Sequence, residues 1–105
     1  MATAKTRLTL QSALEEFLGS RNVYYQPPET IKLKYPCIIY EMNRIQKIPA
    51  DDTAYLKNKE YSLTIVHKDA DSELPDTILD RFEYIGFDRA YVSDNLYHEV
   101  YTIIW

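Results

Sequence analysis

The spacing of the apolar residues changes along this chain, and this change constrains the fold more than any other feature of the sequence. From about Thr6 to Leu18 apolar residues recur every three or four positions, which predicts an amphipathic helix. Gly19 follows directly and is typical of a helix end, because glycine adopts the left-handed conformation freely. From Pro36 onward apolar and polar residues alternate instead, which is typical of strands with one buried face.

Two of the alternating segments predict strands that pair as a long hairpin. The residues expected to face the core are Ile38, Tyr40 and Met42 in the first strand, and Tyr61, Leu63 and Ile65 in the second. The polar segment from Ile48 to Lys59 is predicted to be the loop at the hairpin tip, and long loops in compact domains commonly carry function. A short strand is also predicted at Val23 to Tyr25, before Pro27 and Pro28 interrupt the chain.

A second helix is predicted from Ser72 to Ile85. Pro75 is acceptable in its first turn, where the missing amide hydrogen has no helical partner, and Gly86 is the predicted stop. The apolar stripe of this helix consists of Leu74, Ile78, Phe82 and Ile85. Two more strands are predicted in the segments DRAYVS and YHEVYTIIW, joined by a turn at residues 94–95.

The order α-β-β-β-α-β-β predicts a single α+β domain over residues 1–105, in which two helices pack on one face of an antiparallel sheet. The content of 46% hydrophobic and 27% charged residues is the balance of an ordinary globular chain. Ten tyrosines are compatible both with a β-rich core and with a contact surface. The net charge of −4 makes nucleic acid a poor partner, since phosphate binding needs a basic patch.

Neither the membrane nor an oxidising compartment is indicated by the sequence. No segment reaches the roughly 20 apolar residues that a membrane span needs, and the first residues lack the pattern of a signal peptide. The lone Cys37 excludes an internal disulfide, and its apolar neighbours are typical of a buried, inert thiol. We therefore expect a protein that is made in the cytoplasm and contacts no membrane.

The stretch His67 to Glu73 (HKDADSE) sets a histidine beside three carboxylates, so it has to be weighed as a metal or acid–base site. A calcium-binding loop would need glycine where Leu74 stands. Acids before a helix satisfy its free amide hydrogens and complement its dipole, with Asp71 or Ser72 as the N-cap. We interpret the stretch as a helix start and expect no metal site.

Catalytic patterns are also missing from the sequence. Neither glycine precedes a helix, as a phosphate-binding loop requires, and no serine lies in a nucleophile elbow. His98 lies within the last predicted strand beside Glu99 and is expected on the surface. We expect no catalytic residue and no cofactor. A small enzyme or regulator is the alternative, since two carboxylates that are distant in sequence could meet in a cleft.

Several segments between Pro36 and Trp105 resemble a known family. YPCIIYE, ADDTAY, YSLTIVHKDADSELPDTILDRF and FDRAYVSDNLYHEVYTIIW are similar to the small tail terminator or tail completion proteins of tailed bacteriophages and phage-tail-like particles. The resemblance implies a structural virion protein without a cofactor. It would form a ring, usually of six copies, on the head-proximal end of the tail tube, end tube growth and provide a docking surface for the head. A head–tail connector (neck) protein of the same particle is the alternative.

The partners that the resemblance implies are further copies of the chain, the tail tube protein and the connector, while DNA only passes through the ring. The resemblance carries no short site motif, so candidate contact residues come from pattern alone. They are Asp51, Asp52, Tyr55, Leu56 and Lys57 at the hairpin tip, and Tyr101, Ile103 and Trp105 at the end of the last strand. Because alternate strand residues face opposite ways, Ile103, Ile104 and Trp105 cannot all enter one core.

Overall fold

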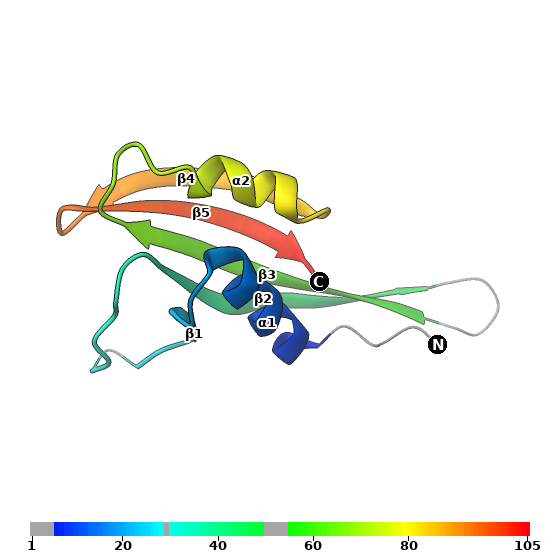
Figure 1. The fold of residues 1–105 in the computed structure, drawn as a ribbon. Coiled ribbons are helices and arrows are strands. Elements are labelled where there is room, and N and C mark those ends of the chain that lie inside the picture. The colour runs from blue at the N-terminus through cyan, green and yellow to red at the C-terminus, as the bar shows by residue number, and fades with distance from the viewer. Residues whose placement is uncertain (1–5, 29, 50–54) are drawn as a thin grey trace.

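The computed structural model describes residues 6–28, 30–49 and 55–105, which form five strands and two helices (Figure 1). In chain order the elements are α1 (Arg7–Leu18), β1 (Val23–Tyr25), β2 (Cys37–Pro49), β3 (Tyr55–His67), α2 (Leu74–Arg81), β4 (Ile85–Ser93) and β5 (Leu96–Ile104). The predicted α+β class, with two helices beside one sheet, is therefore confirmed.

The sheet is mixed, so the prediction of a purely antiparallel sheet is wrong. The strands lie in the order β1-β2-β3-β5-β4, and β1 and β2 form the one parallel pair of this sheet as the structure describes it. Val23 of β1 pairs with Ile38 of β2. The reason lies in the connection: residues 26–36 carry the chain back along the sheet before β2 begins, as a parallel pair requires, whereas a tight turn would give an antiparallel pair.

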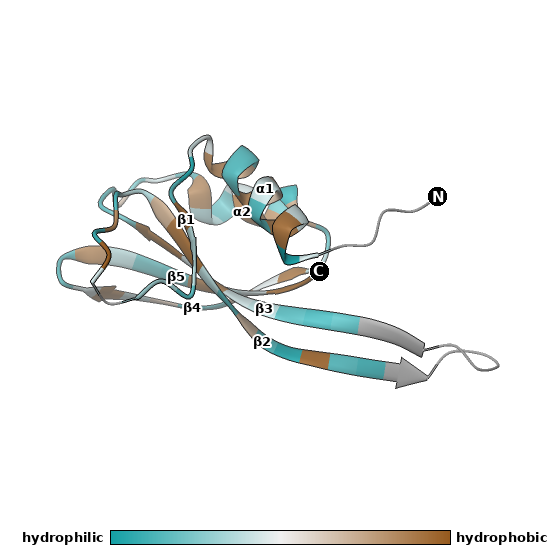
Figure 2. Cartoon of the chain, turned by 90° about the horizontal axis from the view of Figure 1, so that it is seen from below, coloured by the Kyte–Doolittle hydropathy of each residue, from teal (hydrophilic) through white to brown (hydrophobic). Residues whose placement is uncertain are grey.

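Both helices cover the same face of the sheet, and the core lies between them and that face (Figure 2). Leu10, Leu14 and Ile78 are the fully buried residues of the helices. The rings of Phe17 and Phe82 meet edge-on, with centroids 6.2 Å apart. The sheet contributes Val23, Ile38, Tyr40, Tyr61, Leu63, Ile65, Tyr101 and Ile103. The predicted inward face of the hairpin is confirmed, with Met42 partly buried at its margin.

The first helix has defined ends. The side-chain oxygen of Thr6 accepts a hydrogen bond from the backbone N–H of Thr9 at 3.3 Å, and the Thr9 hydroxyl oxygen accepts one from the N–H of Thr6 at 2.9 Å. At the other end Gly19 is left-handed (φ 77°), and its N–H donates to the carbonyl of Glu15. The helix therefore begins and ends close to its predicted bounds.

The second helix is shorter than predicted, because the chain leaves the helix at Phe82 instead of Ile85. Phe82 has an extended backbone, yet its side chain still reaches the core. Ile85 pairs with Ile103 of β5 and Gly86 pairs with Thr102, so both belong to β4. Gly86 is thus a strand residue and not the predicted helix stop. Strand pairing with β5, and not the helical spacing of apolar residues, decides the conformation of these two residues.

The turn before α2 is built by different residues from those predicted. Glu73 holds the N-cap position and makes no side-chain bond there. Asp69 Oδ1 accepts the N–H of Asp71 at 2.9 Å, and Ser72 Oγ accepts the N–H of Leu74 at 3.3 Å. The prediction that this stretch leads into a helix is confirmed, but neither Asp71 nor Ser72 is its N-cap.

The hairpin of β2 and β3 is much longer than predicted. The ladder runs without a loop as far as the pair Pro49 and Tyr55, so most of the segment from Ile48 to Lys59 is strand. Cross-strand pairing continues because the two segments stay in register past the bulge at Met42/Arg44. We call residues 44–49 and 55–60 the ribbon. It projects beyond the helices and the other strands (Figure 2).

Replacing Thr6 by alanine is expected to lower the free energy of unfolding by about 1 kcal/mol, because the N–H of Thr9 loses its acceptor. Urea denaturation followed by circular dichroism measures this loss. Thr30, an exposed threonine outside the helices and strands, provides the control substitution Thr30→Ala. An equal loss in both variants would contradict a capping role for Thr6.

Candidate functional site

The candidate contact residues at the end of the chain belong to the core. Tyr101 and Ile103 are almost fully buried, and the hydroxyl of Tyr101 donates to the carbonyl of Pro75 at 2.9 Å. Trp105 Nε1 donates to the hydroxyl of Thr9 at 2.9 Å. This corrects the expectation that these side chains meet a partner, because the helices cover their face of the sheet. The alternation of the strand is confirmed by Ile104, which points the other way and is 39% exposed.

The candidate residues at the hairpin tip divide into two groups. Asp51 and Asp52 lie outside the described residues. Tyr55, Leu56 and Lys57 form the first part of β3, where they pair with Pro49, Ile48 and Lys47 respectively. They are therefore ribbon residues, and the sequence pattern alone mistook this paired segment for a loop.

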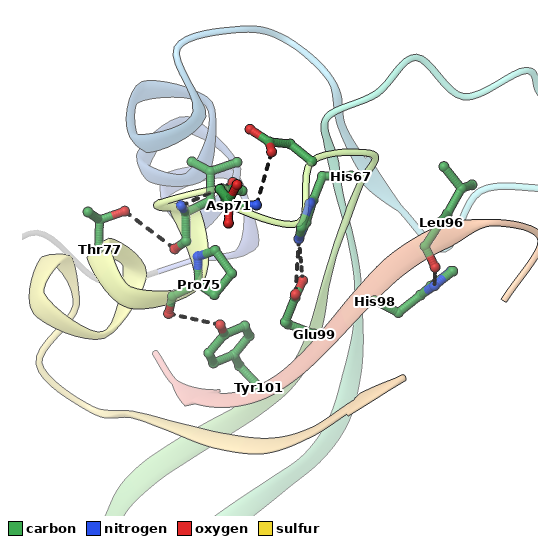
Figure 3. A network of polar contacts seen from close by, with 11 residues as sticks. His67, Asp71, Pro75, Thr77, Leu96, His98, Glu99 and Tyr101 are labelled. Atoms are coloured by element: carbon green, nitrogen blue, oxygen red, sulfur yellow. Dashed lines mark hydrogen bonds and ion pairs between the residues drawn. The ribbon is translucent and has the colours of Figure 1, made fainter. Parts of the chain in front are cut away.

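The histidine at the end of β3 is buried and has a partner that the sequence analysis did not identify. His67 is 4% exposed, and its Nε2 lies 2.8 and 3.0 Å from the two carboxylate oxygens of Glu99 on β5 (Figure 3). Its ring stacks on that of Tyr97, with centroids 5.5 Å apart. The sequence pattern assigns the acids that follow His67 to the start of a helix and indicates no partner for the ring, and the partner lies 32 residues away. The signal for it is the alternation of β5, which places Glu99 on the core face between Tyr97 and Tyr101.

The other ring nitrogen of His67 has no hydrogen-bond partner, although it is buried. Nε2 faces the carboxylate of Glu99, so Nε2 carries the hydrogen. In a neutral ring Nδ1 then has no hydrogen and can only accept. His67 lines a surface pocket of about 260 Å³, together with Tyr35, Pro36, Lys68, Asp69, Ser72 and Leu74.

The described parts of the chain contain no group of three or more His, Cys, Asp or Glu residues placed to hold a metal ion. The other histidine lies apart from the pocket. His98 is half-buried, its Nδ1 lies 3.1 Å from the carbonyl of Leu96, and its ring stacks on that of Tyr91. It pairs with Val66 in the ladder, so it faces the side of the sheet away from the helices.

The turn before α2 and the exposed positions of α2 and its end are strongly acidic. We call this region the acidic surface, and it consists of the exposed residues Asp69, Asp71, Glu73, Asp76, Asp80 and Glu83. Two cations, Lys68 and Arg81, belong to the same segment of the chain. Arg81 lies 3.6 Å from Glu16 of α1, so part of its charge is already compensated.

The outer strand of the sheet exposes large apolar side chains. We call this the apolar edge, and it consists of Tyr84 (60% exposed), Phe87 (51%), Tyr91 (43%) and Val92 (63%) on or beside β4, with Ile104 of β5. Every residue from Gly86 to Asn95 is exposed. Because β4 is the last strand of the sheet, its outer hydrogen-bonding groups are directed away from the ladder with β5. An exposed apolar edge strand is typical of a surface that pairs with another chain.

The free thiol of Cys37 is fully buried, as its apolar neighbours predict, and burial raises the pKa of this thiol to about 11. At about pH 8 we expect a thiol reagent to label the native protein at least 100-fold more slowly than the urea-unfolded protein. Stability should fall as the pH rises toward 11, because the thiol ionises first in the unfolded chain. Equal labelling rates in both states would contradict this burial.

Replacing Glu99 by alanine leaves a buried imidazole N–H without an acceptor, so we expect a loss of about 1–3 kcal/mol in the free energy of unfolding. Glu99→Gln keeps an acceptor oxygen and should lose less. Chemical denaturation measures both, with Glu41→Ala as a control at an exposed site. A loss no larger than that of the control would show that the His67–Glu99 pair contributes nothing.

Comparison with known proteins gives no family for this chain. No protein-family model matches it, and no curated protein matches its sequence. Among the described residues no helix is both long and apolar enough to cross a membrane. The function has to be argued from the surfaces of the chain itself.

Proposed function

We propose that this chain is a structural protein of a phage-type tail, which assembles as a ring on the head-proximal end of the tail tube. The ring ends tube growth and provides the surface to which the head docks. The sequence segments that resemble tail terminator proteins support this proposal. The observation that carries it is the apolar edge, since an exposed apolar edge strand is a template on which another chain can pair.

The two edges of the sheet differ in a way that supports head-to-tail assembly. One edge is the nine-residue β4, and the other is the three-residue β1. Identical copies that meet through different surfaces either close into a ring or continue as an open filament. A protein that ends tube growth has to close, so we assign it a ring.

The charge of the chain fits a ring through which DNA passes. Six copies at −4 each carry a net charge of −24. A lumen of that sign repels phosphates and lets DNA slide without binding. The same reasoning applies to a connector in the neck of the particle, which is the second candidate, and the two roles differ in the neighbour that the ring contacts.

A small enzyme has one observation in its favour, the His67–Glu99 pair beside a pocket. Ser72 also lines the pocket, but its hydroxyl oxygen accepts a hydrogen bond from the N–H of Leu74 at 3.3 Å. This hydroxyl therefore has a structural role in the turn before α2. Burial keeps Cys37 protonated, as its raised pKa of about 11 indicates. We therefore place assembly ahead of catalysis.

The decisive experiment is an electron-microscopic reconstruction of the particle that carries this chain. We expect a closed ring of copies at the end of the tail tube, most simply six. Absence of the chain from that end, or its presence as separate single copies, would contradict the proposal. A ring that contacts the head connector and no tube protein would favour the connector role.

The apolar edge gives a matched pair of variants. Phe87→Lys with Val92→Lys puts two charges on the edge and is expected to prevent ring formation while the fold is kept, as light scattering and circular dichroism would show. Ile31→Lys changes an apolar residue that is 42% exposed away from β4 and should leave assembly unchanged. Rings formed equally well by both variants would exclude the edge as the contact.

A further inference from the structure

Two charged residues in the middle of β4 lie on the same face of the sheet. Successive residues of β5 pair with Phe87 and Arg89, so Asp88 is the extra residue of a bulge. The carboxylate of Asp88 accepts a hydrogen bond at 2.7 Å from Thr102 of β5. Both neighbours of Thr102 are core residues, so Thr102 lies on the face of the sheet away from the helices, which we call the far face. Arg89 pairs with Val100, two residues before Thr102, and therefore lies on the far face as well.

The bulge makes the two halves of β4 match in the faces that their residues occupy. Before the bulge, Ile85 and Phe87 lie on the core face, where each pairs with a core residue of β5. After the bulge, Ala90 and Val92 lie on the core face, because each directly follows a far-face residue. Counted outward from the bulge in either direction, β4 therefore presents core-face and far-face residues in the same order.

This symmetry allows β4 to pair with the β4 of a second copy in one antiparallel register. Its opposite residues are Asp88 and Arg89, Phe87 and Ala90, and Ile85 and Val92. Each of these pairs joins two residues on the same face, and the bulges of the two copies lie opposite each other. A shift by one residue would set core-face residues opposite far-face residues, and a shift by two would do so at the bulge. The faces alone therefore distinguish this register from its neighbours.

The side chains that meet in this register are complementary. The carboxylate of Asp88 lies opposite the guanidinium of Arg89, once on each side of the two-fold axis. Arg89 has no ion pair within the described parts of its own chain. Opposite charges that face each other across two strands stabilise their pairing. On the core face the exposed side chain of Val92 lies against Ile85 of the second copy, so both ends of the pairing remove apolar surface from water.

The far face has a hollow at the place where this register sets a tyrosine. A pocket of about 330 Å³ is lined by Gly86 together with Tyr84, Thr102 and Ile104. A Cβ atom added to Gly86 would meet no atom within 4 Å, so the space above this residue is open. Tyr91 of the second copy lies opposite Gly86 in the register, and its side chain is 43% exposed in a single copy. An aromatic side chain opposite a glycine covers the backbone that the glycine leaves bare.

We propose that two free copies of this chain pair through β4 in this register, so that their sheets join into one. The interface is self-complementary and is complete with two copies. This inference goes beyond the proposed ring, because the pair covers the same apolar edge that a ring contact would use. The pair and the ring contact therefore compete for β4, and a copy has to leave the pair before it can join a ring.

Charge exchange tests the register. Asp88→Arg alone and Arg89→Asp alone each set like charges opposite one another, so each variant is expected to self-associate about tenfold more weakly than the unaltered chain. The double variant Asp88→Arg with Arg89→Asp restores opposite charges and should pair again. An equimolar mixture of the two single variants should also pair, since one carries two arginines at the bulge and the other carries two aspartates.

Analytical ultracentrifugation measures association, and circular dichroism checks that each variant is folded. Glu41→Lys, an exposed charge reversal on β2 away from this edge, is the control and should associate like the unaltered chain. Gly86→Val tests the hollow on the far face. It should leave the fold intact, because a Cβ atom has room there, and it should weaken association by filling the space that Tyr91 of the second copy needs.

Disulfide cross-linking reads the register directly. One chain carries Phe87→Cys and another carries Ala90→Cys, and the new cysteines lie opposite each other only in a pair that contains both chains. Oxidation of the mixture should give a linked dimer, whereas neither variant alone should be linked, because its two cysteines lie too far apart. Cys37 is fully buried and does not compete.

Three results would overturn this pairing. They are a chain that stays monomeric at millimolar concentration, a double charge variant that associates no better than the single variants, and cross-linking of either cysteine variant with itself. If the purified chain pairs as expected but the particle shows no ring at the tube end, the pairing stands and the proposed function fails. If the ring is present and the single charge variants associate like the unaltered chain, the reverse holds.

Discussion

The long strand β3 is the constraint on which the rest of the structure depends. It pairs with β2 on one side and with β5 on the other, so it lies at the centre of the sheet. Tyr61, Leu63 and Ile65 in its second half are fully buried under the helices, while its first half leaves the core as part of the ribbon. Its last residue, His67, forms the buried pair with Glu99. One strand therefore positions the core, the ribbon and the pocket.

A single copy leaves several favourable contacts unmade at its surface. The apolar edge exposes large side chains, and a buried ring nitrogen of His67 has no hydrogen-bond partner. A buried nitrogen without a partner costs stability, and a domain of this size has little to spare. Binding of another chain to the folded state compensates such costs by mass action. The two features lie on different elements of the fold.

The local part of this fold can be predicted from sequence, and the long-range part cannot. Apolar periodicity places α1 and the inward face of the hairpin, because both depend on neighbours within a few residues. Ile85 and Gly86 follow a helical pattern and still join β4, since pairing with β5 decides their conformation. The parallel pairing of β1, the length of the ribbon and the Glu99 partner of His67 all depend on strand register. No spacing along the chain reports register directly.

The number of copies in a ring follows from geometry more than from charge. In a ring of identical copies, the angle between the two contact surfaces of one copy sets the rotation to its neighbour. Two-stranded ribbons twist more strongly than wide sheets. The bulge between Met42 and Arg44 lies where the ribbon leaves the core, and bulges bend a strand and increase its twist. The bulge therefore sets the direction in which the ribbon leaves the core of its own copy, and any contact that used the ribbon would inherit that direction.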